Sequence, residues 1–382
     1  MHTEIARFIG QYEHQIYRDL ETLVNINSFS THAEGIKRMH DALQQVASEI
    51  GVRLESITSS TQSRPHLVYG KDVAGDFYAL MGHFDTVHPP ESDFQTLWEE
   101  EGRLHGPGTN DMKSGLIVAL YSLAILQQLF PDEPLPIKAL FNSDEEIGSP
   151  DSLELITTLF PGAKAGFVFE PARIEHNSLV TARKGILTLD VEIEGRSAHA
   201  GTAPEKGINA ITEAARIILA LDALNDLPAG VSVGCNVIHG GVASNVVADR
   251  CTLEVDIRYR LPEQKAALDT ALETILASPS ASGATIVSRT RHGRPPLVKT
   301  AASGELFDHY RHVSERLGLP CGEVASGGVS DGNFLSHLGI PVLDGVGAVG
   351  DHSHTKKEYT LKATVTRRIE IFCTFMAEQL AA

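Results

Sequence analysis

Short apolar runs alternate with helical stretches along much of the chain, and this alternation limits the possible folds more than any other feature. The runs are four or five residues long and end in polar or glycine-rich clusters; they lie at 77–81, 137–141 and 166–169. Apolar residues recur at helical spacing in 5–26, 35–50 and 114–129. Strands that alternate with helices favour an α/β catalytic domain with a mostly parallel sheet flanked by helices.

The pattern changes at Arg183, where LTLDVEIEG alternates as a strand with one solvated face does. The expected order is then helix, strand, strand, helix, strand, which suits an α+β sandwich. After the turn-forming HGRPP at 292–296, the helix–strand alternation resumes. The second domain is therefore predicted to be an insertion. Residues 1–182 and 295–382 form the first domain, and residues 183–294 form the second.

Length and composition agree with two domains and exclude some partners. A chain of 382 residues exceeds the usual size of one hydrophobic core. The 49 acidic and 32 basic residues give a net charge of −17, which repels nucleic acid and anionic membranes. The N-terminus lacks the pattern of a secretory signal, and no membrane span is expected, so the sequence predicts a cytoplasmic protein. The four cysteines are scattered and are expected to be buried side chains.

Two motifs place polar residues beside the expected strands and helices. In MGHFDTV, His83 and Asp85 are two residues apart, so Asp85 can accept the second ring proton of a metal-bound His83. In GPGTNDMKSG, a loop of small residues leads through Asp111 into a helix. Taken alone, the first pair would be structural and Asp111 would be a helix cap.

Two further motifs follow apolar runs directly. In FNSDEEIGS, Glu145 and Glu146 are adjacent carboxylates that resist desolvation unless a cation lies nearby, although a solvated loop is the alternative. In FVFEPA, Glu170 ends a run that would otherwise be buried, and a buried glutamate needs a partner or a metal. Near the C-terminus, GDHSHTKKEY supplies His352 and His354.

Together these motifs predict a metal site at the rim of the sheet, where ligands bind in open α/β folds. The carboxylates of Asp111, Glu146 and Glu170 carry three negative charges, which two Zn²⁺ ions and one hydroxide would balance. Histidine and carboxylate ligands suit zinc, with cobalt or manganese as alternatives, better than magnesium or calcium. Glu145 remains without a metal and can move a proton.

Over nearly the whole chain, these motifs resemble the di-zinc aminoacylase and carboxypeptidase family, and most closely its glutamate carboxypeptidase (carboxypeptidase G) branch. The resemblance implies that His83 and Glu170 bind one zinc and that Asp111 bridges both metals. It also implies that Glu146 binds the other zinc with a C-terminal histidine, and that Glu145 is the general base.

The family's final histidine usually lies four or five residues before a glutamate that an aromatic residue follows. His354 lies four residues before Glu358 and fits this spacing better than His352, which is the second candidate.

The inserted segment resembles the family's lid and dimerisation domain, through GRSAHAGTAPEKGINAI and NVVADRCTLEVDIRY. The resemblance implies that His199 reaches the active site of a partner subunit and helps to stabilise an oxyanion. Asn245, Arg258 and Arg294 match substrate-binding positions, and a guanidinium suits bidentate capture of a carboxylate. The alternatives are a polar loop residue for His199 and an outward strand residue for Arg258.

The loop SGGVSDGN resembles the family's glycine-rich substrate loop, so Gly327 and Gly328 are expected to line the pocket; glycine is otherwise an ordinary turn signal. This chain departs from the family at two positions that help to select the side chain of the substrate. The glutamate-cleaving branch carries a lysine and a serine where this chain has Ser178 and Val180. Glutamate specificity therefore does not follow from the resemblance.

The residues and the resemblance predict a zinc-dependent hydrolase that cleaves an amide or peptide bond next to a free carboxylate. One alternative is an N-acyl-amino-acid deacylase of the acetylornithine or succinyl-diaminopimelate type, with the same metals and another pocket. A second is a non-catalytic metal-binding protein on this scaffold. The expected partners are a small peptide or N-acyl amino acid, and a second copy of the chain bound through the lid domain.

Overall fold

The structure is a computed structural model that describes residues 2–60 and 64–381. The chain divides into two compact units. Unit 1 contains Met1–Ala182, Lys299–Ser326 and Ser330–Ala382, and unit 2 contains Arg183–Val298 and Gly327–Val329. The chain enters unit 2 at Arg183 and returns to unit 1 at Lys299, and the sequence analysis placed these boundaries at residues 183 and 295. Part of the predicted substrate loop, Gly327–Val329, belongs to unit 2.

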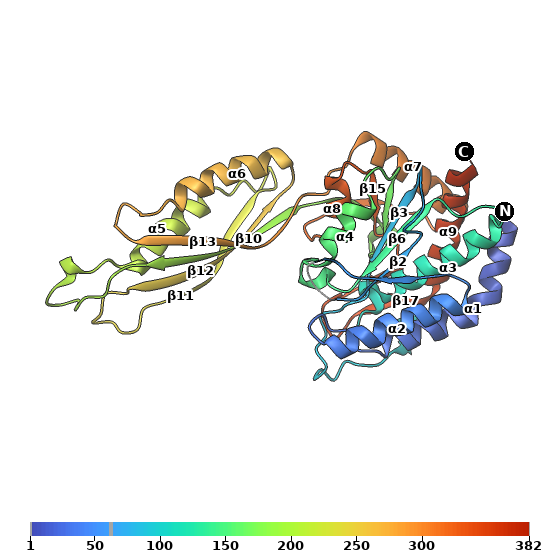
Figure 1. The fold of residues 1–382 in the computed structure, drawn as a ribbon, viewed down its shortest axis with the longest axis horizontal. Helices are drawn as coiled ribbons and strands as arrows, with labels where there is room; N and C mark the ends of the chain where they lie inside the picture. The colour runs from blue at the N-terminus through green and yellow to red at the C-terminus, as the bar shows by residue number, and fades with distance from the viewer. Residues whose placement is uncertain (1, 61–63, 382) are drawn as a thin grey trace. The chain divides into compact units, whose positions relative to one another are not determined.

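Unit 1 is built on an eight-stranded sheet with the strand order β1-β2-β6-β3-β7-β15-β9-β14 (Figure 1). The strands are β1 (Glu55–Ile57), β2 (His66–Tyr69), β3 (Tyr78–His83), β6 (Ile137–Asn142), β7 (Gly166–Val168), β9 (Leu179–Arg183), β14 (Glu323–Ser326) and β15 (Val342–Asp344). In the centre, β3 is parallel to both β6 and β7, and β7 is parallel to β15. Towards the edges, β1 is antiparallel to β2, β2 is antiparallel to β6, and β9 is antiparallel to β15. The predicted mostly parallel sheet is therefore found in the four central strands.

Helices cover both faces of this sheet, as the alternating pattern predicted. The helices are α1 (His2–Val24), α2 (Ala33–Glu49), α3 (Ser114–Leu129), α4 (Ser152–Leu159), α7 (Ala301–Arg316), α8 (Gly332–His337) and α9 (Lys362–Ala381). Helices α1, α3 and α9 pack against one another within the largest hydrophobic core. Figure 1 shows α4 and α8 on the opposite side of the sheet from α3 and α9.

Helix α3 is apolar on every side because it lies in the middle of the core. Every residue from Ser114 to Leu126 is buried. Within the described residues, Thr109–Leu129 is the one stretch long and apolar enough to cross a membrane, judged by length and composition alone. Of its most apolar window, 83% is buried inside the fold. A helix that is hydrophobic all round and covered by protein is a core helix.

A second, smaller sheet in unit 1 joins segments that are far apart in the sequence. Its order is β4-β5-β17-β16-β8. The strands are β4 (Trp98–Glu100), β5 (Arg103–His105), β8 (Ala172–Arg173), β16 (Val349–Asp351) and β17 (Tyr359–Leu361). Strands of two or three residues are too short to show a periodicity, so the sequence did not indicate this sheet. It fixes both ends of the segment that contains His352 and His354.

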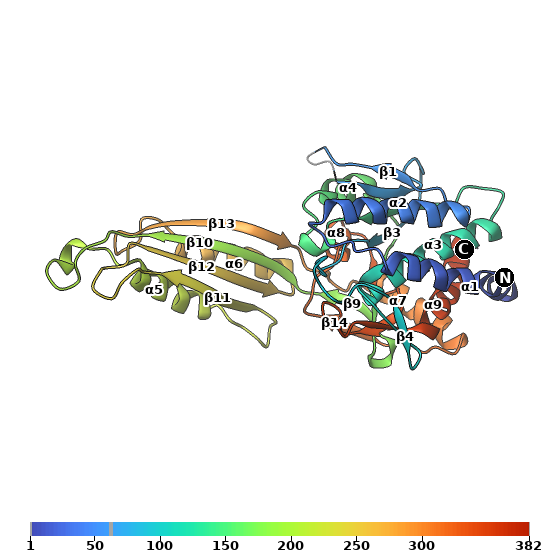
Figure 2. The ribbon, with the colours of Figure 1, turned by 90° about the horizontal axis from the view of Figure 1, so that it is seen from below.

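Unit 2 is an antiparallel four-stranded sheet with two helices, as expected for the inserted domain (Figure 2). The strands follow the order β11-β12-β10-β13, and the elements are β10 (Gly185–Glu194), α5 (Ala210–Asp222), β11 (Ser232–Gly240), β12 (Arg250–Tyr259), α6 (Pro262–Ile275) and β13 (Thr285–Arg294). Alternate residues of β12 are buried and share one core with α5 and α6.

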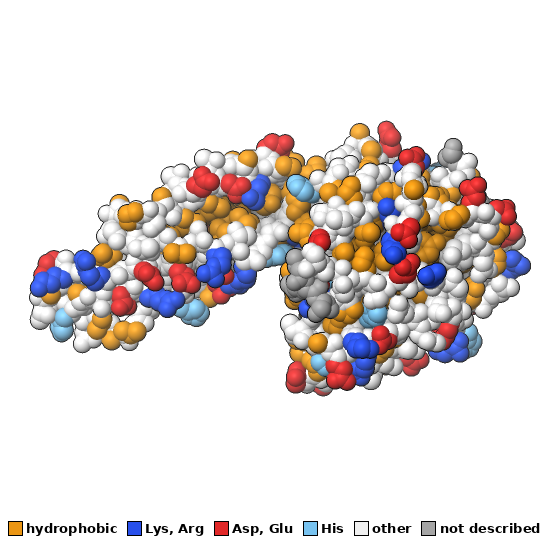
Figure 3. Space-filling model, viewed as in Figure 1, with side chains coloured by type: hydrophobic (Ala, Val, Ile, Leu, Met, Phe, Trp, Pro, Cys, Tyr) orange, Lys and Arg blue, Asp and Glu red, His pale blue; other side chains and the backbone are white. Residues whose placement is uncertain are grey.

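The other face of this sheet carries charges of both signs. Arg291 pairs with Asp190 and, at 3.0 Å, with Glu254. Figure 3 shows acidic and basic side chains interspersed on the visible surface of unit 2. The turn expected at 292–296 begins later than predicted, because Arg294 still pairs with Ile186 in the sheet.

Candidate active site

The carboxyl ends of three central strands bring three of the sequence motifs to one edge of the sheet. His83 is the last residue of β3. Glu145 and Glu146 lie in a short 3-10 turn just after β6, and Glu170 follows β7. Because β3 lies between β6 and β7 and is parallel to both, these residues lie at the same edge of the sheet.

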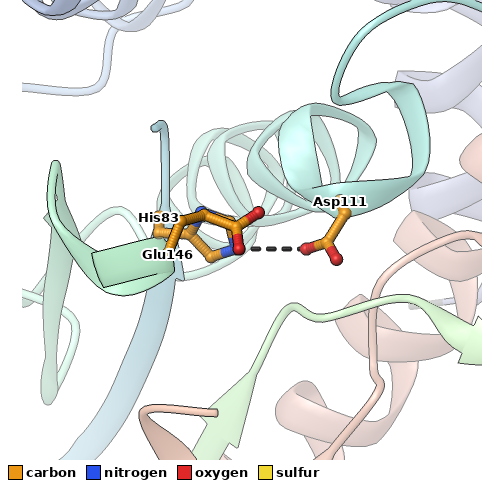
Figure 4. Close-up of side chains that lie close together, drawn as sticks. All are labelled: His83, Asp111 and Glu146. Atoms are coloured by element: carbon orange, nitrogen blue, oxygen red, sulfur yellow. Dashed lines mark hydrogen bonds and ion pairs between the residues drawn. The ribbon is translucent and has the colours of Figure 1, made fainter. Parts of the chain in front are cut away.

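Asp111 completes the cluster from the turn that precedes α3 (Figure 4). The Nε2 atom of His83 lies 3.2 Å from Oδ1 of Asp111 and 3.5 Å from Oε1 of Glu170. Single ligand atoms of His83, Asp111 and Glu146 all lie within 4.8 Å of one another. The first group of donors is thus His83, Glu170 and one oxygen of Asp111.

His354 forms a second group of donors with the other oxygen of Asp111. Its Nε2 atom lies 3.3 Å from Oδ2 of Asp111 and 3.2 Å from Oε2 of Glu146. His352 lies elsewhere: its ring packs against Tyr359, with 6.0 Å between the centroids. The structure therefore places His354 rather than His352 among the carboxylates.

The carboxylates strongly favour the protonated form of both histidines. Burial lowers the pKa of His83, but hydrogen bonds to Asp111 and other carboxylates outweigh burial and raise it well above its usual value. Hydrogen bonds to Asp111 and Glu146 raise the pKa of His354 to about 11. A site that attracts a proton at each Nε2 atom in this way also attracts a metal cation.

The carboxylates respond to burial and to one another. Burial opposes ionisation of Asp111, but hydrogen bonds from His354 and His83 hold its pKa far below the usual value. Burial, followed by the charge of Asp111, raises the pKa of Glu146 to about 7. Burial and the Asp111 charge also raise the pKa of Glu170. The cluster therefore holds more negative charge than the protein alone can easily stabilise.

A divalent metal ion fits this arrangement of donors. Each of two histidine Nε2 atoms faces two carboxylate oxygens, which is a mixed nitrogen and oxygen ligand set. The Oε1 atom of Glu146 is buried and has no hydrogen-bond partner within residues 2–60 and 64–381. A cation would give this oxygen a partner and would offset the charge of the carboxylates.

Asp85 connects His83 with the turn that carries the two glutamates. Its side chain is fully buried. The Nδ1 atom of His83 lies 3.0 Å from the backbone carbonyl of Asp85 and 3.4 Å from its Oδ1 atom, so the carbonyl is the nearer partner. The carboxylate accepts the backbone N–H groups of Glu145 and Glu146, at 3.1 and 3.2 Å, and the hydroxyl of Ser30 at 2.7 Å. Asp85 therefore positions the Glu145–Glu146 turn as well as the His83 ring.

Two buried charged residues beside the cluster were not predicted from the sequence. Lys113 is fully buried and donates to the backbone carbonyl of Ile26 at 2.8 Å, and burial lowers its pKa to about 7. Glu358, which served only as a landmark for spacing, is 1% exposed and accepts backbone N–H groups of the Asp111 loop. The lysine in GPGTNDMKSG was a signal that could have been followed, because a lysine ahead of an apolar helix is rarely buried without a reason.

In unit 2, two predicted substrate or oxyanion residues lie on adjoining backbone segments. His199 is exposed, and its Nδ1 atom accepts the N–H of Gly201 at 3.1 Å. Asn245 is also exposed, and its backbone carbonyl accepts the N–H of Ala200 at 2.9 Å. Both side chains are therefore accessible on the surface of unit 2.

The two arginines predicted to bind substrate are less available to a ligand than the sequence suggested. The Nε and Nη2 atoms of Arg258 each lie 2.9 Å from an oxygen of Asp256, and its Nη1 lies 3.4 Å from the carbonyl of Gly327. The bidentate side of this guanidinium is thus already occupied by its neighbour on β12. Arg294 is 2% exposed. Gly328 is exposed, and its carbonyl accepts from Nη1 of Arg183 at 3.3 Å.

The two residues that depart from the glutamate-cleaving pattern are both buried. The hydroxyl of Ser178 donates to the carbonyl of Glu175 at 2.6 Å, and Val180 pairs with Asp344 in the sheet. Their side chains serve the local fold of β9.

Histidines and carboxylates gathered at the ends of the parallel strands of an α/β unit form a candidate metal site, and together with the family match that follows they make this chain a metal-dependent hydrolase. The chain belongs to the peptidase family M20/M25/M40, whose sequence profile matches residues 79–378. The family resemblance drawn from the motifs is thereby confirmed.

Individual relatives agree with this assignment. The chain is 30% identical to carboxypeptidase G2 from Pseudomonas sp. (strain RS-16) over 373 residues, which cover 93% of this chain and 86% of the relative. It is 28% identical to acetylornithine deacetylase from Myxococcus xanthus over 320 residues, with coverage of 77% and 80%. The fold matches that of an M20 family metallo-carboxypeptidase from Sulfolobus solfataricus with a TM-score of 0.73, at 16% identity and coverage of 94% and 98%.

Proposed function

We propose that this protein is a dinuclear zinc carboxypeptidase that cleaves an amide or peptide bond next to a free carboxylate. The observation that carries the proposal is the shared position of Asp111, whose two oxygens each face a different histidine at 3.2 and 3.3 Å. One carboxylate between two separate groups of donors suits a pair of metal ions. The similarity to carboxypeptidase G2 supports the reaction.

In this proposal His83, Glu170 and Asp111 would hold one ion, and His354, Glu146 and Asp111 would hold the other. Zinc is the proposed metal, with cobalt or manganese as alternatives, because imidazole and carboxylate ligands suit these ions. When bound, the metals would supply Lewis-acid polarisation of the substrate carbonyl and would lower the pKa of a water molecule.

Glu145 is the proposed general base. It follows β6 directly and lies next to a proposed metal ligand, and its backbone N–H is held by Asp85. It would take a proton from the attacking water and pass it to the leaving amine. The Glu145→Gln variant is expected to keep its metal content and to lose turnover by a factor of about 10²–10⁴. Turnover close to that of the wild type would rule out this role.

Unit 2 is proposed to bind the substrate and to complete the site. His199, exposed on its loop, would donate a hydrogen bond to the oxyanion in the active site of a partner subunit. Asn245, Gly327 and Gly328 would contact the substrate. Arg258 would reach a substrate carboxylate through Nη1, because Asp256 holds its other two nitrogens. The burial of Arg294 favours a supporting role for that residue.

A second candidate is an N-acyl-amino-acid deacylase, which would use the same metals and the same base. It is favoured by the buried Ser178 and Val180 at the positions that depart from the glutamate-cleaving branch, and by the similarity to acetylornithine deacetylase. A non-catalytic metal-binding protein is disfavoured by the presence of Glu145 beside a full set of ligands.

We also propose a homodimer, formed through unit 2, in the cytoplasm. Strand β11 lies at the edge of its sheet and packs beside α5. Large apolar side chains are exposed on this side: Ile211 by 40%, Leu219 by 72%, Ile238 by 49% and Val242 by 86%. Light scattering is expected to give the mass of a dimer, and Leu219→Glu is expected to shift it towards the monomer.

One experiment tests the central proposal. Metal content per chain is measured on the purified protein, and hydrolysis is followed on matched substrates that end in free glutamate, in other free amino acids, or in an acylated amino acid. Two metal ions and cleavage of substrates with a free carboxylate are expected. Cleavage of acyl amino acids alone would favour the deacylase, and an absence of bound divalent metal would refute both enzymes.

A further inference from the structure

Glu358 contacts the backbone of the loop that carries Asp111, and nearly all of its surface is covered by protein. It is 1% exposed. Its Oε1 atom accepts the backbone N–H groups of Asn110 and Asp111, both at 2.9 Å. Its Oε2 atom accepts the N–H of Gly108 at 3.0 Å and lies 2.9 Å from Nε2 of His88. One carboxylate thus gathers three N–H groups from the loop that carries Asp111.

The same loop is bound to the C-terminal segment at two more points. The side-chain amide of Asn110 donates to the hydroxyl of Ser353 at 2.7 Å, and the hydroxyl of Thr360 donates to the carbonyl of Thr109 at 2.8 Å. A side chain at Gly350 would place its Cβ atom 2.2 Å from Oδ1 of Asn110, so the two segments are in close contact. We call these contacts between residues 108–111 and residues 350–360 the clasp.

The clasp joins the two proposed ligands that come from different parts of the chain. Asp111 lies at the end of one clasped segment, and His354 lies within the other, four residues before Glu358. The backbone at His354 has a φ of +65°, and that at His352 has a φ of +61°. Residues other than glycine keep such a conformation where the surrounding structure imposes it. The clasp provides that surrounding structure.

We propose that Glu358 is a positioning residue that sets the spacing between Asp111 and His354, and thereby the affinity for a metal ion bound between them. This inference rests on the proposed dinuclear function. His83 and Glu170 are placed instead by the ends of β3 and β7, which the clasp does not include. Loss of the clasp should therefore weaken one metal site more than the other.

The test uses Glu358→Gln in the full chain. Glutamine has nearly the same shape, but its amide nitrogen is a donor and would face backbone N–H groups, so one side of the clasp loses its acceptor. The matched control is Glu213→Gln, in unit 2. Glu213 is also buried, at 6% exposed, and accepts from Arg216 and Ser282. A merely structural effect of losing a buried carboxylate should be similar in the two variants.

Metal is removed from each protein with a chelator, and Co²⁺ is titrated back while its absorption spectrum is recorded. The wild type and Glu213→Gln are each expected to bind two ions. Each binding step should have the same affinity in these two proteins. In Glu358→Gln, one binding step should weaken by about 10- to 100-fold, with a changed spectrum for that step, and the other step should change less. Equal affinities for both steps in all three proteins would overturn the inference.

Two further outcomes are informative. If the wild type binds only one ion, the dinuclear proposal fails, and the role of Glu358 is then judged on that single ion, which it should still affect through Asp111. If Glu358→Gln does not fold, the milder Ser353→Ala removes only the bond to Asn110 and should weaken one step by about three- to tenfold. Unchanged binding by Ser353→Ala would then overturn the inference.

Discussion

Replacement of Asp85 by asparagine tests whether this carboxylate organises the active site. In the wild type, Oδ1 accepts the N–H of Glu145 and Oδ2 accepts the N–H of Glu146 and the hydroxyl of Ser30. Asparagine keeps one acceptor oxygen. Its amide nitrogen is best tolerated at the Oδ2 position, because the Ser30 hydroxyl can rotate and become the acceptor. The N–H of Glu146 is then left without a partner.

The expected magnitude follows from these contacts. A buried donor that loses its acceptor costs about 1–3 kcal/mol, and the loss of the negative charge weakens the contacts with Glu145 and His83 as well. We expect the free energy of unfolding of Asp85→Asn to fall by about 2–4 kcal/mol. Turnover should fall further than stability explains, by about 10²–10³-fold, because the turn that carries the proposed base and a proposed ligand is displaced.

The assay compares Asp85→Asn with Asp19→Asn under conditions where both proteins are folded. Asp19 is also buried, at 5% exposed, and accepts the hydroxyl of Tyr121 at 2.6 Å, but it belongs to α1 and not to the cluster. Urea unfolding reports the stability of each protein, and kcat is measured on metal-loaded enzyme. If Asp85→Asn retained the kcat of Asp19→Asn, the assignment of Asp85 as the organising residue would be wrong.

Three further predictions concern metal, pH and packing. Removal of metal with a chelator should lower the unfolding temperature, because a ligand at a thousandfold excess over its Kd contributes about 4 kcal/mol; an unchanged temperature would argue against a metal site. The pKa of His354 is raised to about 11 in the folded protein, compared with about 6.5 in the unfolded chain. Protonation of His354 therefore contributes its full stabilisation of the metal-free fold at pH values below about 6.5. This stabilisation is lost as the pH rises through about 11, so between about pH 7 and about pH 9.5 the urea midpoint of the metal-free wild type should change more unfavourably than that of metal-free His354→Gln. Equal changes in the two proteins would contradict the raised pKa, because the opposite contribution of Lys113 is the same in both. Gly115→Ala would place its Cβ atom 1.9 Å from the carbonyl oxygen of Phe169, so the free energy of unfolding should fall by about 2–4 kcal/mol in denaturant titrations. Gly10→Ala, in α1, would place its Cβ atom where no neighbouring atom lies within 4 Å, so the free energy of unfolding should rise by about 0.5–1 kcal/mol.

Local patterns were sufficient for the main elements of unit 1 and unit 2. The helix expected at 114–129 is α3 with the same bounds, and the strand expected at 137–141 is one residue longer in the structure. These elements could be predicted because apolar periodicity reflects burial along a single segment. The motifs also indicated which residues share the carboxyl edge of the sheet, because parallel neighbours end on the same side.

Contacts between distant segments could not be predicted in the same way. Glu358 binds the N–H of Asn110 across 248 positions of sequence, and nothing in the pattern around either residue indicates the other. The pairing of Arg258 with Asp256 was overlooked for a different reason. Residues two apart on a strand share a face, so this pair was visible in the sequence, but the guanidinium was assigned to a substrate instead.

The sequence by itself determined the class of fold, the expectation of an inserted domain and the donor side chains apart from the choice between His352 and His354, because helices, strands and their ends depend on residues close together in the chain. Only the tertiary structure decided that His354 and not His352 faces Glu146, that the backbone carbonyl of Asp85 is the nearer partner of His83, and that Glu358 supports the Asp111 loop. These contacts depend on the distances between separate segments, which packing of the whole unit sets.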